Sequence, residues 1–87
     1  MTIYKYDLPG DFGPFSVPMP KGADILHIAA QHDNGQLWVK VDPAAKTVQR
    51  DFVSVPTGGD VPKNGLHLGS FTTMGGKLAF HIFEVKK

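Results

Sequence analysis

Glycine and proline interrupt this chain of 87 residues too often for a long helix to form in it. There are ten glycines and seven prolines, and both residue types weaken or end regular helices. With one exception, no segment keeps apolar residues at the 3.6-residue spacing of a helix over three turns. Yet 41% of the residues are hydrophobic, a composition that favours a folded chain over a disordered one. The sequence therefore predicts an all-β domain of short strands joined by turns.

Alternating apolar and polar residues mark seven candidate strands, each bounded by turn-forming residues. The strands are expected at residues 2–8, 15–19, 24–32, 36–42, 47–55, 66–72 and 77–85. Prolines confine the second of these strands to a sheet edge. Residues 23–32 also fit a short helix, but the Asn34-Gly35 pair that follows is typical of a hairpin turn and favours a strand. We expect a small antiparallel barrel or sandwich of six or seven strands, in one domain spanning residues 1–87.

The last candidate strand indicates that its sheet is covered on both faces. Its apolar residues are Leu78, Phe80 and Ile82 on one face and Ala79, Phe83 and Val85 on the other. His81 lies in the middle of this strand, where a buried imidazole needs hydrogen-bond partners. A chain of this size can cover both faces only by curling its sheet or by binding a second subunit. We therefore expect a homo-oligomer, at least a dimer.

Charge and cysteine content exclude several classes of function. Nine basic and eight acidic residues give a formal net charge of +1, which argues against binding to duplex nucleic acid. The absence of cysteine rules out disulfides and a thiolate nucleophile. No apolar run approaches the roughly 18 residues that span a bilayer, and the first residues lack the layout of a signal peptide. We expect a soluble, cytoplasmic protein without a membrane partner.

Residues for catalysis or metal binding do not occur in recognisable patterns. None of the serines lies in a G-x-S-x-G nucleophile elbow, and most aspartates stand beside turn residues, where solvated carboxylates are common. The four histidines form neither an HxH pair nor an HExxH motif. We therefore predict no catalytic residue, no metal site and no cofactor.

A few residues that occur once, or in a distinctive local context, suggest a binding site. The Thr57-Gly58-Gly59 loop could bring backbone amides and a hydroxyl close to an anion, although a plain flexible turn explains it as well. Arg50 is the only arginine, and a guanidinium binds phosphate through two parallel hydrogen bonds. Trp38 is the only tryptophan and is expected on the polar face of its strand, where it could stack on a base.

Segments along nearly the whole chain also match a known pattern. They are residues 4–9, 19–26, 37–38, 41–43, Arg50 with Phe52, 57–58, 68–71 and 76–84. Through these segments the chain resembles a family of short, functionally uncharacterised proteins of bacteriophages and prophages. The second glycine of the loop, Gly59, and the proline-rich residues 10–18 depart from the pattern, so the resemblance says little about those two loops.

The resemblance implies that the protein acts in the cytoplasm of a phage host, by binding and without catalysis. One class of small phage proteins sequesters the nucleotide signals of host immunity, such as cyclic dinucleotides or cyclic ADP-ribose variants. We therefore expect a non-catalytic protein that captures such a nucleotide. Arg50 and the Thr57-Gly58-Gly59 loop would hold phosphate. Trp38 or Phe52 would stack on a base, and His81 would help to form the pocket or the subunit interface.

Two other functions fit the sequence as well. The protein could dock on a host defence protein or a host metabolic protein and inhibit it, with Trp38, Tyr4 and Tyr6 as aromatic anchors. It could also be a structural phage accessory domain that assembles with itself.

Overall fold

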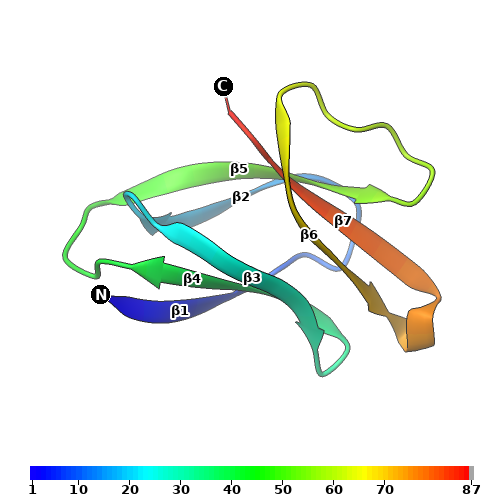
Figure 1. The fold of residues 1–87 in the computed structure, drawn as a ribbon, viewed down its shortest axis with the longest axis horizontal. Coiled ribbons are helices and arrows are strands. Elements are labelled where there is room, and N and C mark those ends of the chain that lie inside the picture. The colour runs from blue at the N-terminus through cyan, green and yellow to red at the C-terminus, as the bar shows by residue number, and fades with distance from the viewer. Residues whose placement is uncertain (87) are drawn as a thin grey trace.

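The computed structural model describes residues 1–86 and contains seven strands in two antiparallel sheets (Figure 1). The strands are β1 (Thr2–Asp7), β2 (Gly13–Pro20), β3 (Asp24–Gln31), β4 (Asn34–Val41), β5 (Thr47–Pro56), β6 (Gly65–Thr73) and β7 (Leu78–Val85), with a short 3-10 helix η1 (Met74–Gly76) before the last. The predicted all-β fold is confirmed, and residues 24–31 form a strand and not a helix. No helix within residues 1–86 has the length and apolar character needed to cross a membrane.

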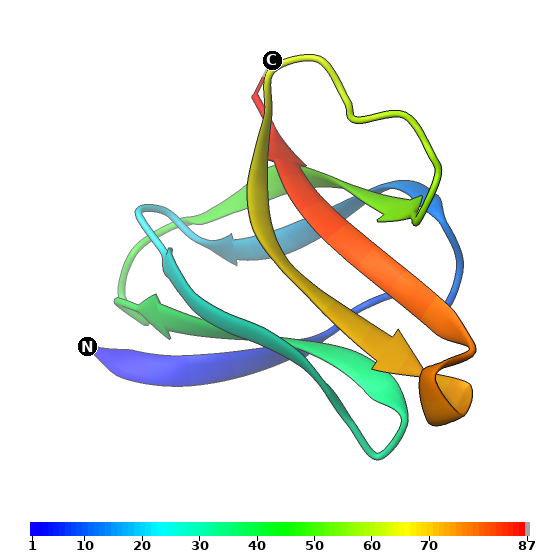
Figure 2. The same cartoon turned by 45° about the vertical axis from the view of Figure 1, so that its right-hand side comes forward.

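The two sheets face each other and meet along one side. One sheet has the order β1-β4-β3 and the other the order β2-β5-β7-β6, so the consecutive strands β1 and β2 belong to different sheets. Figures 1 and 2 show the three-stranded sheet beneath the four-stranded one. The edge strands β3 and β6 pack beside each other. At that contact a Cβ added at Gly69 would lie only 3.2 Å from the Cβ of Ile28.

The hydrophobic core lies between the sheets. On β4 the side chains of Leu37, Val39 and Val41 are fully buried, whereas Trp38 and Lys40 point outward, as the alternation of the sequence predicts. The same cluster contains Leu8, Val17, Met19, Ala23, Ile28, Phe52, Phe71, Phe80 and Ile82. Residues from both sheets therefore share one core, which is the arrangement of a small sandwich.

The turn between β3 and β4 differs from the sequence prediction. We expected Asn34-Gly35 to form it, but the two turn residues are His32 and Asp33, which both have positive φ (52° and 62°), as a two-residue hairpin turn requires. Gly35 is instead buried inside β4. A Cβ there would overlap the ring of Phe71, standing 2.8 Å from Cε2. The predicted hairpin is confirmed, but its turn lies two residues earlier than we expected. Gly35 is not available for the turn because it is needed inside β4, where a larger residue would overlap the ring of Phe71.

The outer face of β7 is covered by the chain itself. Phe83, which points away from the core, is buried. It lines a cavity together with Val55 and Val61, and Gly65 also lies against its ring. The loop of residues 57–64 thus shields the second apolar face that the sequence predicts for this strand.

Ser54 is an exception to the apolar lining of the core. Its side chain on β5 is 3% exposed, and the hydroxyl has no hydrogen-bond partner among the described residues. Since burying an unpaired hydroxyl costs free energy, we expect Ser54→Ala to raise the free energy of unfolding by about 1 kcal/mol, measured by urea denaturation.

Ser16 provides the matched control for Ser54. Its hydroxyl is exposed and donates a hydrogen bond of 2.6 Å to Asp51, so Ser16→Ala should leave stability unchanged or lower it slightly. A loss of stability in Ser54→Ala would contradict the expectation and indicate that the buried hydroxyl is satisfied.

Candidate ligand-binding site

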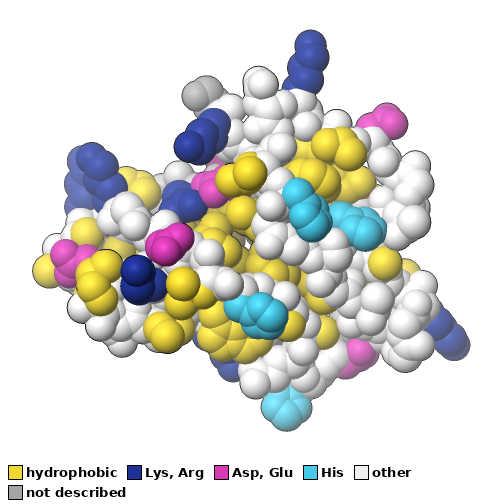
Figure 3. All heavy atoms as spheres, viewed as in Figure 1, with side chains coloured by type: hydrophobic (Ala, Val, Ile, Leu, Met, Phe, Trp, Pro, Cys, Tyr) yellow, Lys and Arg dark blue, Asp and Glu magenta, His cyan; other side chains and the backbone are white. Residues whose placement is uncertain are grey.

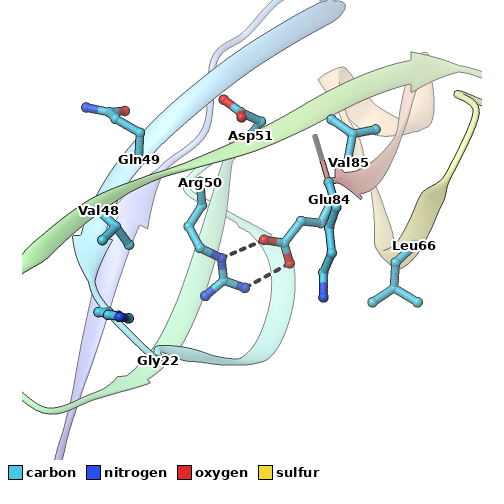
Figure 4. Close-up of a pocket in the computed structure, with 10 residues that line it drawn as sticks. Gly22, Val48, Gln49, Arg50, Asp51, Leu66, Glu84 and Val85 are labelled. Atoms are coloured by element: carbon cyan, nitrogen blue, oxygen red, sulfur yellow. Dashed lines mark hydrogen bonds and ion pairs between the residues drawn. The ribbon is translucent and has the colours of Figure 1, made fainter.

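Arg50, which we expected to hold phosphate, is bonded within the protein instead. Its Nε and Nη2 donate hydrogen bonds of 2.5 and 2.8 Å to the two carboxylate oxygens of Glu84, and Nη1 donates to the carbonyl of Ala23 at 2.7 Å. Figure 4 shows the guanidinium facing the carboxylate. The side chains are only 21% and 10% exposed, and the hydrogen bonds that Arg50 donates to Glu84 raise the pKa of Arg50. The pair links β5 and β7 to the start of β3.

The cavity beside this pair is large but offers no convergent binding groups. It has a volume of about 640 Å³, and Lys21 and Lys86 are among the residues that line it. Its other charged side chains are engaged with the protein, since Arg50 pairs with Glu84 and Asp51 accepts a bond from Ser16. The predicted role of Arg50 in phosphate binding therefore has no support in this geometry, because a paired guanidinium has lost most of its donors and its net charge.

The two aromatic residues expected to stack on a base also lie apart from each other. Phe52 is 1% exposed and stacks on Phe15 with a centroid distance of 5.4 Å. Its ring is part of the core and has no face available to a ligand. Trp38 is half-buried on the outer face of the other sheet, where its ring lies 5.6 Å from that of His27. Neither residue can therefore share a site with the loop after β5.

The remaining predicted residues come together at a second cavity, which we call the two-histidine pocket. It has a volume of about 250 Å³ and is lined by Val55, Pro56, Thr57, Gly58, Gly59, Val61, His67, His81 and Phe83. Figure 3 shows two neighbouring histidine side chains beside hydrophobic ones, close to the loop that follows β5. Thr57, Gly58, Gly59 and His81 were all predicted from the sequence, and His67 was not.

A chain of three hydrogen bonds runs through the two-histidine pocket. Nε2 of His81 lies 2.8 Å from the Thr57 hydroxyl, and its Nδ1 lies 2.7 Å from the Ser70 hydroxyl. Nε2 of His67 lies 3.1 Å from that same hydroxyl of Ser70. The expectation that the imidazole of His81 has hydrogen-bond partners is therefore met at both ring nitrogens.

The position of Thr57 follows from a turn that needs glycine. The Gly59 amide donates to the carbonyl of Pro56 at 2.9 Å, and Gly58 has a φ of +91°. These are the features of a type II turn, in which the third residue has positive φ. Thr57 is the second residue of the turn and lies above His81. One glycine amide is thus used by the turn itself, so the loop presents fewer free amides than the sequence suggests.

His67 and Ser70 reach the same face of β6 because the strand is irregular. In a regular strand, residues three apart point to opposite faces. Here a bulge lies between His67 and Gly69, so that His67 pairs with Phe83 while Ser70 pairs with His81. A glycine inside a strand pattern is the usual sign of a bulge. Gly69 is therefore the one signal in the sequence that could have placed His67 beside His81.

The hydrogen-bond chain can run in either direction. The Ser70 hydroxyl has a single hydrogen and can accept further bonds, and a neutral imidazole has one donor and one acceptor nitrogen. Thr57 can therefore donate toward His81, Ser70 and His67 in turn, or His67 can donate toward Ser70, His81 and Thr57. The described residues lining the cavity include no carboxylate.

The close approach of Ser70 to His81 also resembles a nucleophile and its base. The other nitrogen of His81 faces a hydroxyl instead of a carboxylate, and a hydroxyl provides no charge to stabilise an imidazolium formed during catalysis. Within residues 1–86 no cluster of three His, Asp or Glu side chains could hold a metal ion.

Comparisons with known proteins give the chain a family but no activity. Searches of curated proteins and of solved structures found no match. A family model matches residues 1–87, and its description is that of a domain of unknown function, DUF7352. Because the match spans the whole chain, this protein belongs to the DUF7352 family.

Proposed function

We propose that this protein is a non-catalytic binding domain that captures a small phosphate-bearing nucleotide in the two-histidine pocket. The observation that carries the proposal is the continuous chain of hydrogen bonds from Thr57 through His81 and Ser70 to His67, at the edge of a cavity with otherwise apolar walls. A ligand with an anionic group and a flat apolar part would satisfy both halves of such a site.

The two halves of the pocket suit the two parts of a nucleotide. Both ring nitrogens of His81 are engaged within the hydrogen-bond chain, so the donor offered to phosphate is at one end of the chain, either the Thr57 hydroxyl or Nδ1 of His67. The Gly58 amide donates no hydrogen bond to other described residues. Phe83 and Val61 offer apolar surface to a base, and the ring of His67 stands edge-on to that of Phe83 at 5.2 Å. A volume of about 250 Å³ fits one nucleotide unit.

The resemblance to phage proteins guides the choice of nucleotide. Signals of host immunity, such as cyclic dinucleotides and cyclic ADP-ribose variants, contain the required phosphate and base. Under this proposal the protein sequesters such a signal in the host cytoplasm, as a homo-oligomer in which each copy carries a pocket. It would release the ligand chemically unchanged.

A nucleotide panel tests the proposal directly. The protein is heated with and without cyclic dinucleotides, cyclic ADP-ribose isomers and linear mononucleotides. A ligand present at about 100 times its Kd should add roughly 2.7 kcal/mol to the free energy of unfolding, a shift in Tm on the order of ten degrees for a domain of this size. The bound compound is then recovered and examined by mass spectrometry. A flat panel would contradict nucleotide capture, and a hydrolysed product would contradict binding without turnover.

His81→Gln should weaken binding of the best panel compound about 10- to 100-fold, because the variant loses the imidazole that bonds to both the Thr57 and the Ser70 hydroxyls. Isothermal titration calorimetry measures the change.

Trp38→Ala is the matched control for the pocket. Trp38 lies on the opposite sheet, so its loss should leave the Kd unchanged. If Trp38→Ala abolished binding while His81→Gln did not, the ligand site would lie on the three-stranded sheet and the assignment would be wrong.

A further inference from the structure

The four edge strands of the two sheets differ in how they are protected. β3 and β6 lie against each other, so neither presents an open edge. On β2 the Lys21 amide donates to Lys46 at 2.8 Å, which continues the register of the β2–β5 ladder. By alternation, the amides of the even-numbered residues face outward. Three of these residues are Pro14, Pro18 and Pro20, which have no N–H to donate.

β1 is the edge that remains open. It pairs with β4 on one side, and no other described strand pairs with its second side. The Leu8 amide donates to Gly35 at 2.9 Å, so the even-numbered residues of β1 bond to β4. The N–H and C=O groups of Ile3, Lys5 and Asp7 therefore point outward. An unguarded edge of this kind is a template for another strand.

The side chains of β1 also expose apolar surface. Ile3 is 60% exposed, and Tyr4 is 39% exposed although it lies on the core face of the sheet. Tyr4 and Tyr6 pack edge to face with a centroid distance of 6.3 Å. A strand added beside β1 would cover these side chains and would pair the unused backbone groups at the same time.

Charge identifies a second copy of β1 as the occupant. In an antiparallel pair with Tyr6 opposite Tyr6, Lys5 of each copy stands opposite Asp7 of the other. A shift of two residues in one direction puts Lys5 opposite Lys5, and a shift in the other direction puts Asp7 opposite Asp7. Because like charges directly opposite each other are unfavourable, the strand is complementary to itself in one register.

We propose that two copies of this protein associate through antiparallel pairing of their β1 strands, with Lys5 opposite Asp7 across the two-fold axis. The three-stranded sheets of the two copies then form one continuous sheet. The Lys5 ammonium donates to Gln31 of β3 at 2.7 Å, on the side away from the open edge, and on association it would exchange this partner for Asp7 of the second copy. This proposed dimer interface is independent of the two-histidine pocket, which lies on the other sheet.

A charge swap tests this interface. Sedimentation equilibrium of the native protein between about 1 and 500 µM should give a monomer–dimer equilibrium in the micromolar range, as suits a small interface. Lys5→Asp and Asp7→Lys each place like charges opposite one another and should raise the dimer Kd at least about 10-fold. The double variant restores opposite charges and should return the Kd to within about 3-fold of the native value. The double variant also shows that any loss in the single variants is not misfolding.

A backbone test separates strand pairing from simple charge attraction. Lys5→Ala and Lys5→Pro both remove the ammonium, but only Lys5→Pro removes an outward N–H. Lys5→Pro should therefore dissociate the dimer further than Lys5→Ala at equal Tm. A native protein that stays monomeric at about 500 µM would overturn the proposal and leave the edge to a strand of a different protein. A dimer Kd that stays the same in Lys5→Asp, Asp7→Lys, Lys5→Ala and Lys5→Pro would also overturn the proposal.

Discussion

Arg50→Ala should lower the free energy of unfolding by about 3 kcal/mol, because it leaves a buried carboxylate without its partner. Glu84 is 8% exposed and accepts two hydrogen bonds from the guanidinium, while a third bond holds the carbonyl of Ala23. The substitution would remove all three. The measurement is urea denaturation at neutral pH.

The pH range of this contribution follows from the raised pKa of Arg50. A cation whose pKa is higher in the folded state stabilises that state below its unfolded pKa, and the stabilisation is lost as the pH rises through the folded pKa. The pKa of an arginine already lies far above neutral pH. The contribution of Arg50 is therefore present at neutral pH and at mildly alkaline pH, and the cost of Arg50→Ala should not change between about pH 7 and pH 10.

Two further variants identify the source of the loss. Arg50→Lys keeps the charge but cannot form the paired hydrogen bonds, so it should cost about half as much. The double substitution Arg50→Met with Glu84→Leu removes both charges and keeps apolar volume, and should be close to the native protein in stability. A loss below about 1 kcal/mol in Arg50→Ala would instead indicate a pair screened by solvent.

Gly35→Ala should cost about 1–3 kcal/mol, at the upper end of that range, because the added methyl group meets an aromatic ring with no room to move. The Phe71 ring beside Gly35 is stacked on Phe80 at 5.0 Å, and Phe80 is stacked on Phe12 at 4.7 Å. Movement of the first ring would disturb the other two. Thermal unfolding of the variant checks the expected loss.

Gly10→Ala is the matched control for Gly35→Ala. A Cβ at Gly10 has no neighbour within 4 Å, so this change should alter stability by less than about 0.5 kcal/mol. Phe71→Leu combined with Gly35→Ala should cost less than the sum of the two single changes, since the smaller side chain leaves space for the methyl group. Strictly additive costs would contradict a direct clash between the two positions.

The fold could be predicted because it depends on local patterns. The alternation in β4 places Leu37 inward and Trp38 outward, and the same rule puts Glu84 on the core face of β7. The hairpin turn could not be placed correctly, because the glycine that normally marks such a turn is here required by Phe71, which lies 36 positions later in the chain. Local preference and tertiary packing favour different roles for the same residue.

The candidate site was only partly predictable for a similar reason. Thr57 and His81 were predicted, and they meet because Val55 pairs with His81 in the β5–β7 ladder. His67 was missed because a bulge changes its face. Arg50 was assigned to phosphate on its chemistry alone, and the sequence contains no indication that Glu84, 34 residues away, would neutralise it. The chemistry of a side chain indicates which groups it can bind, but the register of the paired strands determines which of those groups lies beside it.

The prolines of β2 limit how far any assembly of this protein can grow. A sandwich with two open edges can add molecules at both and extend into a fibre, whereas one with a single open edge stops after one addition. Here Pro14, Pro18 and Pro20 deny hydrogen-bond donors to an incoming strand on the second edge. Whatever pairs with β1, the β2 edge of the other sheet is a poor template for a further strand, so an assembly is protected against amyloid-like growth from that edge.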